Sequence, residues 1–253
     1  MSERFVPIAD GFWNVRGSFK VSGMVEIGTH TSLVRRASGS FVLLDAYTLQ
    51  GEIKERVFAL TDGGRAIEAV LHLHPFHTIH VRPIAELLPH AVHVGSARHR
   101  ARAPAVHWSD LSIETEACAD HFAADFDFSI PAGVPFIAAD ERLHFSSVLA
   151  FHRASQTLHV DDTLTWSTVP LLGGLWFHPS LGKVLEKRPG AAAEFRAWAQ
   201  ALIERCGDVR HLVTAHMKTL PADPTESPVL QERVRAALER VEPILRWHAR
   251  RYG

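Results

Sequence analysis

Histidine side chains crowd residues 69–80, AVLHLHPFHTIH, where an apolar run changes into a histidine cluster. His72 and His74 are two residues apart, so on an extended backbone their side chains point to the same side. His77 follows Pro75, which ends strand pairing and lets the chain turn back. Imidazoles gathered at a strand end suit a borderline metal ion such as zinc. The spacing predicts a metal site; because the chain has 17 histidines, a histidine-rich strand end without metal is the plainer alternative.

Other residues that can bind a metal stand at the limits of further predicted strands. His144 begins one strand, Asp162 follows another, and His216 follows the last. A histidine-rich shell with one carboxylate suits zinc, and neutral imidazoles leave the centre with a net positive charge. Such a centre lowers the pKa of a bound water to about 7 and polarises a carbonyl or phosphoryl oxygen. The expected chemistry is hydrolysis by metal-bound hydroxide.

The bulk composition limits the classes of partner. The chain has 253 residues, of which 46% are hydrophobic and 22% charged, which is typical of a globular protein with one large or two small domains. The formal net charge is −1, and basic and acidic residues are interspersed. Binding to nucleic acid needs a concentrated basic face, so a small-molecule substrate is expected and nucleic acid is not.

Cysteine usage and hydropathy indicate a compartment. The two cysteines, Cys118 and Cys206, are too few for a disulfide framework. The first ten residues contain no apolar core of signal-peptide length, and no apolar run is long enough to cross a membrane. We therefore expect a cytoplasmic protein without a membrane partner. Nothing in the residue pattern predicts an oligomeric state.

The first half of the chain predicts alternating strands and helices. Strands are expected around residues 12–15, at 30–36, 40–46, 67–73 and 92–94, with a helix at 53–60 that ends at Gly63-Gly64 and another from Pro83. The basic stretch 99–102 is predicted to be a surface loop. Residues 117–139 show little periodicity.

The second half predicts a hairpin of residues 143–152 and 157–160, then an apolar, glycine-containing loop at 171–178. A helix opened by Pro189 carries an apolar face that includes Cys206, which is therefore expected in the core. A last strand covers 210–215, and a helix from Ser227-Pro228 should be kinked at Pro243. Because no linker interrupts the pattern, residues 1–253 are predicted to form a single domain.

Taken in order, these motifs resemble the metallo-β-lactamase-fold superfamily over most of the chain. VLHLHPFH is similar to the His-x-His-x-Asp-His motif, and LHFSSVL to the Gly-His-Thr-Pro-Gly-Ser region. VDDTL is similar to the Gly-Asp-x-Leu element, and VTAHMK to the Gly-His-Gly element. The resemblance implies an α/β fold: a four-layer αββα sandwich of two mixed β-sheets flanked by helices.

The resemblance also implies ligands for two metal sites. The first would use His72, His74 and His144. The second would use His77 and His216, with Asp162 bridging the two metals. LLDAYT resembles the early Leu-x-Asp strand end of the family, which gives Asp45 a structural role in supporting the motif loop.

Phe76 is the main departure from the family pattern. Members usually carry an aspartate there, as a ligand of the second metal and a candidate proton acceptor, and phenylalanine can do neither. The glycine before His144 is replaced by Leu143, Met217 follows His216, and the Gly-Gly after the motif is absent. These changes indicate a divergent member with one zinc ion rather than two. Asp162 would then be a fourth ligand or a catalytic base.

Two substitutes for missing ligands remain open. His80 could partly replace the lost aspartate, although an exposed bystander is the simpler interpretation. Asp161 could stand in for Asp162, because the pair is adjacent in sequence.

The resulting expectation is a metal-dependent hydrolase acting on a small ester, thioester, amide or phosphoester. Phe76, Trp176 and His178 are candidate substrate contacts; core packing for the aromatic residues and a capped loop for His178 are the alternatives. A non-catalytic descendant of the fold that binds a metal or ligand is a second possibility. A mononuclear iron oxygenase is a third, because some family members have an iron shell that resembles two histidines and one aspartate.

Overall fold

The first half of the chain forms a six-stranded mixed sheet, in the order β1-β2-β5-β6-β7-β8. The computed structural model describes residues 4–21, 25–26, 28–167, 173–215 and 230–253. Pairs from β1–β2 to β5–β6 are antiparallel, and β6–β7 and β7–β8 are parallel. The strands are β1 (Arg4–Ala9), β2 (Phe12–Gly17), β5 (Thr29–Arg35), β6 (Phe41–Leu44), β7 (Ile67–Leu71) and β8 (Val92–Val94), beside a ribbon of β3 (Lys20–Val21) and β4 (Val25–Glu26).

The second half forms a four-stranded sheet in the order β14-β11-β10-β9. β11 pairs parallel to β14, and the other neighbours are antiparallel. A separate antiparallel pair, β12–β13, follows Asp162. The strands are β9 (Phe126–Ser129), β10 (Leu149–His152), β11 (Thr157–Val160), β12 (Leu164–Ser167), β13 (Gly174–Phe177) and β14 (His211–Thr214).

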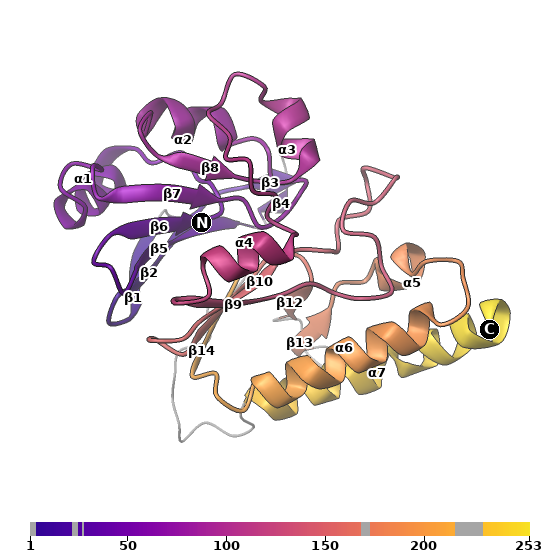
Figure 1. Cartoon of the computed structure of the whole chain (residues 1–253). Coiled ribbons are helices and arrows are strands. Elements are labelled where there is room, and N and C mark those ends of the chain that lie inside the picture. The colour runs from indigo at the N-terminus through magenta and orange to yellow at the C-terminus, as the bar shows by residue number, and fades with distance from the viewer. Residues whose placement is uncertain (1–3, 22–24, 27, 168–172, 216–229) are drawn as a thin grey trace.

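Helices cover the outer faces of the two sheets. Figure 1 shows α1, α2 and α3 beside the first sheet, and α6 with α7 across the second. Burial of Ile53, Val57 and Ile84 attaches α1 and α2 to the first sheet, while Phe195 and Leu245 belong to the core under α6 and α7. The fold is therefore the αββα sandwich that the sequence predicts. The helices are α1 (Gly51–Leu60), α2 (Val81–Leu87), α3 (Ala97–Arg102), α4 (Glu116–His121), α5 (Leu181–Val184), α6 (Ala191–Arg205) and α7 (Leu230–Tyr252).

The space between the sheets holds an apolar cluster that includes Phe12, Leu71, Phe126, Val148 and Val213. Alternate residues of a strand share a face, so the positions two and four residues from Phe12 also point into this space. Those positions are polar and buried. Together with similar positions on β5 and β11 they form a polar layer inside the sandwich: Asn14, Arg16, His30, Ser32 and His159.

Several predicted elements are confirmed and others are wrong. The strands β5, β6, β7, β8, β11 and β14 and the helices α1, α2 and α6 lie where the patterns predict them, and Cys206 is buried. Residues 99–102 are not a surface loop but part of α3, where His99 is fully buried. The predicted 171–178 loop contains β13, and the first hairpin arm becomes a strand only at Leu149. Residues 117–139, which lack periodicity, include most of α4 and all of β9.

Pro243 lies inside α7, while the predicted start of this helix at Ser227-Pro228 falls outside the described residues. Within the part of the chain that the structure describes, no helix combines the length and the hydropathy that a membrane crossing requires.

Candidate metal site

Three of the predicted histidine ligands surround one carboxylate oxygen of a fourth predicted ligand, Asp162. Asp162 Oδ2 lies 3.4 Å from His74 Nε2, 3.7 Å from His77 Nε2 and 3.6 Å from His144 Nδ1. His74, His77 and Asp162 offer ligand atoms that all lie within 4.8 Å of one another. His144 stands at the rim, with a side chain that is 41% exposed. The arrangement is therefore a compact group of two histidines and one carboxylate with a third histidine facing solvent.

The distances from Asp162 Oδ2 to the three histidines fit a zinc-sized cation, and His74, His77 and Asp162 are the members that also lie within 4.8 Å of one another. Bonds of about 2.0–2.1 Å in tetrahedral geometry put ligand atoms about 3.4 Å apart. The observed distances of 3.4–3.7 Å from Asp162 Oδ2 are close to that value. His74 Nε2 is buried and makes no hydrogen bond within the described residues. Binding through this atom would require the His74 proton to move to Nδ1, which in the structure accepts a 3.3 Å bond from the Phe76 N–H.

Asp45 fixes the loop that carries His74 and His77. Its Oδ1 accepts the Leu73 N–H at 2.7 Å, and its Oδ2 lies 3.2 Å from His77 Nδ1. A carboxylate on the far nitrogen of a histidine orients the ring and increases the basicity of the ligating nitrogen. His77 Nε2 is thereby directed at Asp162. The predicted structural role of Asp45 agrees with these contacts.

Hydroxyl groups hold the His144 and Asp162 segments together. Thr163, directly after Asp162, donates to the Phe145 carbonyl at 2.8 Å and accepts the Ser147 N–H at 3.2 Å. Ser180 donates to the His144 carbonyl at 2.9 Å. These bonds connect the chain before β10 to the chain after β11, so the two ligands from the second sheet are held in a fixed relation.

The charges of His77 and Asp45 stabilise each other. Burial alone would lower the pKa of His77, but hydrogen bonds and charge from Asp162 and Asp45 raise its pKa well above the usual value. Burial alone would raise the pKa of Asp45, but His77 outweighs it and the pKa is lowered. Without metal, the site therefore holds a proton on His77 beside an ionised Asp45.

Burial shifts the pKa values of His74 and Asp161 in the directions that favour their neutral forms. Burial, reinforced by the charge of His77, holds the pKa of His74 well below its usual value. Burial and the nearby charge of Asp45 raise the pKa of Asp161 well above its usual value. Because metal ligands bind in their deprotonated forms, a cation entering this site would release the His77 proton.

His72 does not face this group. Its Nε2 lies 2.9 Å from His93 Nδ1, and its ring packs on His99 and Trp108 with centroid distances of 5.1 and 5.3 Å. The two-residue alternation fails because β7 ends at Leu71, so His72 and His74 are no longer on an extended strand. His216, the remaining predicted ligand, lies outside the described residues.

The predicted substrate contacts have different surroundings. The Phe76 ring stacks on the His144 ring with centroids 4.8 Å apart, and the Arg98 guanidinium lies over the Phe76 ring, 4.6 Å from its centroid. Trp176 lies in β13 with the Arg240 guanidinium of α7 at 4.4 Å from its ring centroid. His178 Nδ1 lies 2.8 Å from Ser180 Oγ, the hydroxyl that holds the His144 carbonyl. Phe76 is thus the one whose ring contacts a candidate ligand.

Comparison with solved structures identifies the architecture. The FIM-1 metallo-β-lactamase from Pseudomonas aeruginosa, in its mono-zinc form, superposes with a TM-score of 0.61 over 95% of this chain and 96% of that chain, at 10% identity. A metallo-β-lactamase from Erythrobacter litoralis gives 0.60 over 94% and 96%, at 15% identity. This chain has the metallo-β-lactamase fold. A Nostoc sp. PCC 7120 chain described as a diflavin flavoprotein also matches, with a TM-score of 0.58 over 97% and 98% at 14% identity.

Sequence comparison adds no closer relative. No family profile matches the sequence, and no curated protein matches it. The metallo-β-lactamase fold is therefore shown by the structure, together with the order of motifs along the chain.

The polar layer behind the site contains residues that the motif analysis did not identify. His30 Nε2 lies 3.2 Å from Asp161 Oδ1, and His159 Nε2 lies 3.9 Å from the same atom. Arg16 donates to the Thr214 carbonyl at 2.5 Å and lies beside His30. The sequence gives no signal for this layer, because Asn14 and Arg16 alternate with apolar residues as in an antiparallel strand with one face in solvent.

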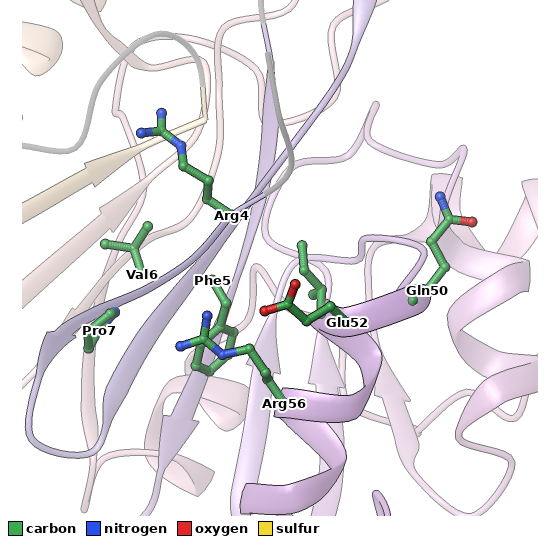
Figure 2. A pocket seen from close by; sticks show the side chains of 9 residues that line it. Arg4, Phe5, Val6, Pro7, Gln50, Glu52 and Arg56 are labelled. Carbon is green, nitrogen blue, oxygen red and sulfur yellow. The ribbon is translucent and has the colours of Figure 1, made fainter.

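A surface groove lies apart from the candidate ligands. With a cavity volume of about 700 Å³, it runs between β1 and the start of α1. Figure 2 shows Arg56 beside the ring of Phe5, over which its guanidinium lies at 4.8 Å. None of the four clustered metal-site residues lines it.

Proposed function

We propose that this chain is a metal-dependent hydrolase that binds one metal ion through His74, His77 and Asp162, with His144 completing the site. The observation that carries the proposal is the position of Asp162 Oδ2, 3.4–3.7 Å from nitrogens of all three histidines, within a metallo-β-lactamase fold. A bound zinc ion would supply a water ligand with a pKa of about 7 and would polarise a carbonyl or phosphoryl oxygen. The expected substrates are small esters, thioesters, amides or phosphoesters.

Residues around the proposed ion would orient a ligand, admit substrate and accept a proton. Asp45 holds His77 in the orientation that directs Nε2 to the site. His144 and His77, with side chains 41% and 23% exposed, line the side open to solvent, from which substrate would approach. Asp162 would bind the ion through Oδ2, the oxygen that lies near the three histidines, and its second oxygen, Oδ1, is the candidate base. Phe76 would present an apolar surface next to His144.

Phe76 supports one ion rather than two. It occupies the motif position at which the family pattern has a carboxylate, and its ring contacts both His144 and Arg98. A guanidinium at that position disfavours a second cation through charge repulsion. Zinc is the preferred metal, because three imidazoles and one carboxylate match its usual ligands.

Elemental analysis of the purified chain tests the proposal, together with hydrolysis of a panel of ester, thioester, amide and phosphoester probes before and after chelation. We expect about one zinc per chain and activity that chelator removes and zinc restores. His74→Ala should lose both. The matched control is His80→Ala, because His80 bonds the Thr48 hydroxyl at 2.8 Å and is not part of the group around Asp162. No stoichiometric metal, or metal unaffected by His74→Ala, would refute the proposal.

The ligand composition favours a second candidate, a mononuclear iron oxygenase. The group within mutual ligand distance consists of two histidines and one carboxylate, the set used by many non-haem iron oxygenases. Iron in place of zinc by elemental analysis, with substrate-dependent oxygen uptake, would select it. A chain that binds metal yet is inert in both assays would instead be a non-catalytic binding protein.

A further inference from the structure

A chain of hydrogen bonds in the polar layer leads from Arg16 on β2 to the loop that carries Asp162. Arg16 is 4% exposed, and its described partners are neutral: Asn14, His30 and the carbonyls of Thr214 and Ala215. Burial, with the charge of Arg4, lowers the pKa of Arg16 to about 10, which leaves it protonated at neutral pH. A guanidinium carries five donors and no acceptor, so each of these contacts has a fixed direction.

Asn14 is oriented by three contacts, of which the shortest is the 2.9 Å bond that its Nδ2 donates to Ser32 Oγ. Arg16 Nη1 donates to Asn14 Oδ1 at 3.5 Å, and Asn14 Nδ2 donates to the Thr31 carbonyl at 3.3 Å. The amide nitrogen must therefore be the atom that lies 3.3 Å from His30 Nδ1. Arg16 Nη1 lies 3.4 Å from the same ring nitrogen. His30 Nδ1 thus faces two donors and must present its lone pair.

The tautomer of His30 follows from these assignments of donors and acceptors. A neutral imidazole with its lone pair at Nδ1 carries its proton at Nε2. His30 Nε2 lies 3.2 Å from Asp161 Oδ1, so it donates to that carboxyl group. Asp161 directly precedes Asp162 in the chain. The orientation of the Asp161 carboxyl, and with it the backbone that presents Asp162, depends on this bond.

We propose that Arg16 is a positioning residue for the candidate metal site: it imposes the Nε2–H tautomer on His30, which in turn holds Asp161 and directs Asp162 at the three histidines. Arg16 also joins the sheets, because it lies on β2 and bonds the carbonyls of Thr214 and Ala215 at the end of β14. Loss of Arg16 would let the His30 proton move to Nδ1. The Nε2 lone pair would then face Asp161 Oδ1, so the bond from His30 would be lost, and the carboxyl group would have to shift or turn its own O–H toward Nε2.

The same residues have a competing interpretation as a second cation site, because ligand atoms of His30, His159 and Asp161 lie within 4.8 Å of one another. Two observations oppose it. A cation at His30 Nε2 would require the proton at Nδ1, where two side-chain donors lie; this obstacle is larger than at His74 Nδ1, which faces one backbone donor at 3.3 Å. It would also lie close to the Arg16 guanidinium, which repels it in a buried environment.

The tautomer is measured directly by ¹⁵N NMR of the imidazole nitrogens in metal-free protein labelled at histidine, with His30→Gln to assign the signals. We expect a bare Nδ1 and a protonated Nε2 for His30. In Arg16→Met the proton should move at least partly to Nδ1, and the zinc affinity should fall about 10- to 100-fold, as it does when groups behind a ligand are removed. Arg16→Lys keeps a cation that can only donate, so it should keep the tautomer and most of the affinity.

Arg36→Met is the matched control, because Arg36 is also largely buried and joins distant segments, through Asp125, but lies outside the polar layer. It should leave the His30 signals and zinc affinity unchanged. A protonated Nδ1 in the wild type, an unchanged tautomer in Arg16→Met, or an equal zinc loss in Arg36→Met would overturn the proposal. Two zinc ions per chain, reduced to one by His30→Gln, would support the competing site instead.

The zinc-affinity measurement rests on the proposed function, but the NMR measurement of the His30 tautomer does not. If the wild-type chain binds no zinc, the hydrolase proposal fails, and the NMR result still decides the role of Arg16. If Arg16→Met does not fold, the wild-type tautomer and its retention in Arg16→Lys decide.

Discussion

Replacing Asp45 by asparagine separates the orienting role of this carboxylate from its contribution to folding. The amide oxygen of the new side chain can still accept the Leu73 N–H, which Asp45 Oδ1 now accepts at 2.7 Å. The amide nitrogen, however, would present N–H donors to His77 Nδ1, which lies 3.2 Å from Asp45 Oδ2. His77 would then carry its proton at Nε2, the nitrogen that faces Asp162. Asp45→Asn therefore blocks a ligand atom while leaving the ligand in place.

The magnitude follows from the partners that are lost. Removing the group behind a ligating histidine costs about 10- to 100-fold in metal affinity, which is about 1.4–2.7 kcal/mol. The metal-free protein should lose about 1–3 kcal/mol of stability, because the bond between Asp45 and charged His77 is exchanged for a neutral one. Zinc titration with a competing chelator gives the first quantity, and urea unfolding of the metal-free chain gives the second.

Asp125→Asn is the control for general destabilisation. Asp125 is 4% exposed, accepts the Ala37 N–H at 2.7 Å and bonds Arg36 at 2.7 Å, so it matches Asp45 in burial and in kind of partner. It lies away from the candidate ligands and should lower stability without changing zinc affinity. Equal zinc affinity in Asp45→Asn and wild type, or an equal loss in both variants, would refute the orienting role of Asp45.

Three further predictions address metal count, pH dependence and packing. Phe76→Asp should raise the zinc count toward two by elemental analysis, and the neutral Phe76→Asn should not; an unchanged count in Phe76→Asp would separate position 76 from a second site. Burial lowers the pKa of His152 to about 4, so the unfolded chain takes up a proton there that the folded chain does not, and this one residue should lower stability by up to about 3 kcal/mol as pH drops from 6.5 to 4. In His152→Gln the unfolding free energy, measured by urea titration at several pH values, should depend less on pH between 6.5 and 4. An unchanged dependence would mean that other residues cause it. Phe195→Ala removes a fully buried ring that contacts Phe177 at 5.2 Å, and should cost about 3–5 kcal/mol in urea unfolding.

The motif region was predictable because its information is local. The apolar run before His72, the proline after His74 and the acidic pair at Asp161-Asp162 each mark a strand end in the sequence itself. The family resemblance that these ends carry implied the fold, and it implied His74, His77, His144 and Asp162 as ligands together with His72 and His216. The meeting of the first four depends only on which strands end at the same edge of the sandwich.

The errors arise where the outcome depends on atoms distant in sequence. His72 turns away because β7 stops at Leu71 and His93 offers a ring nitrogen 2.9 Å away, and neither fact is visible in the motif. Residues 99–102 look like an exposed basic loop, yet the His99 ring is buried against His72 of a distant segment, with ring centroids 5.1 Å apart. The bond between His30 and Asp161 spans 131 positions and could not be anticipated from either segment.

The candidate ligands are divided between the two layers of strands. His74 and His77 follow β7 of the first sheet, whereas His144 precedes β10 and Asp162 follows β11 of the second. Any ion bound by these residues would therefore connect the two sheets. When the free ion is present at a thousand times its dissociation constant, its binding would stabilise the folded state by about 4 kcal/mol. Neither half of the chain could retain such an ion alone, so metal uptake would report the moment at which the layers have joined during folding.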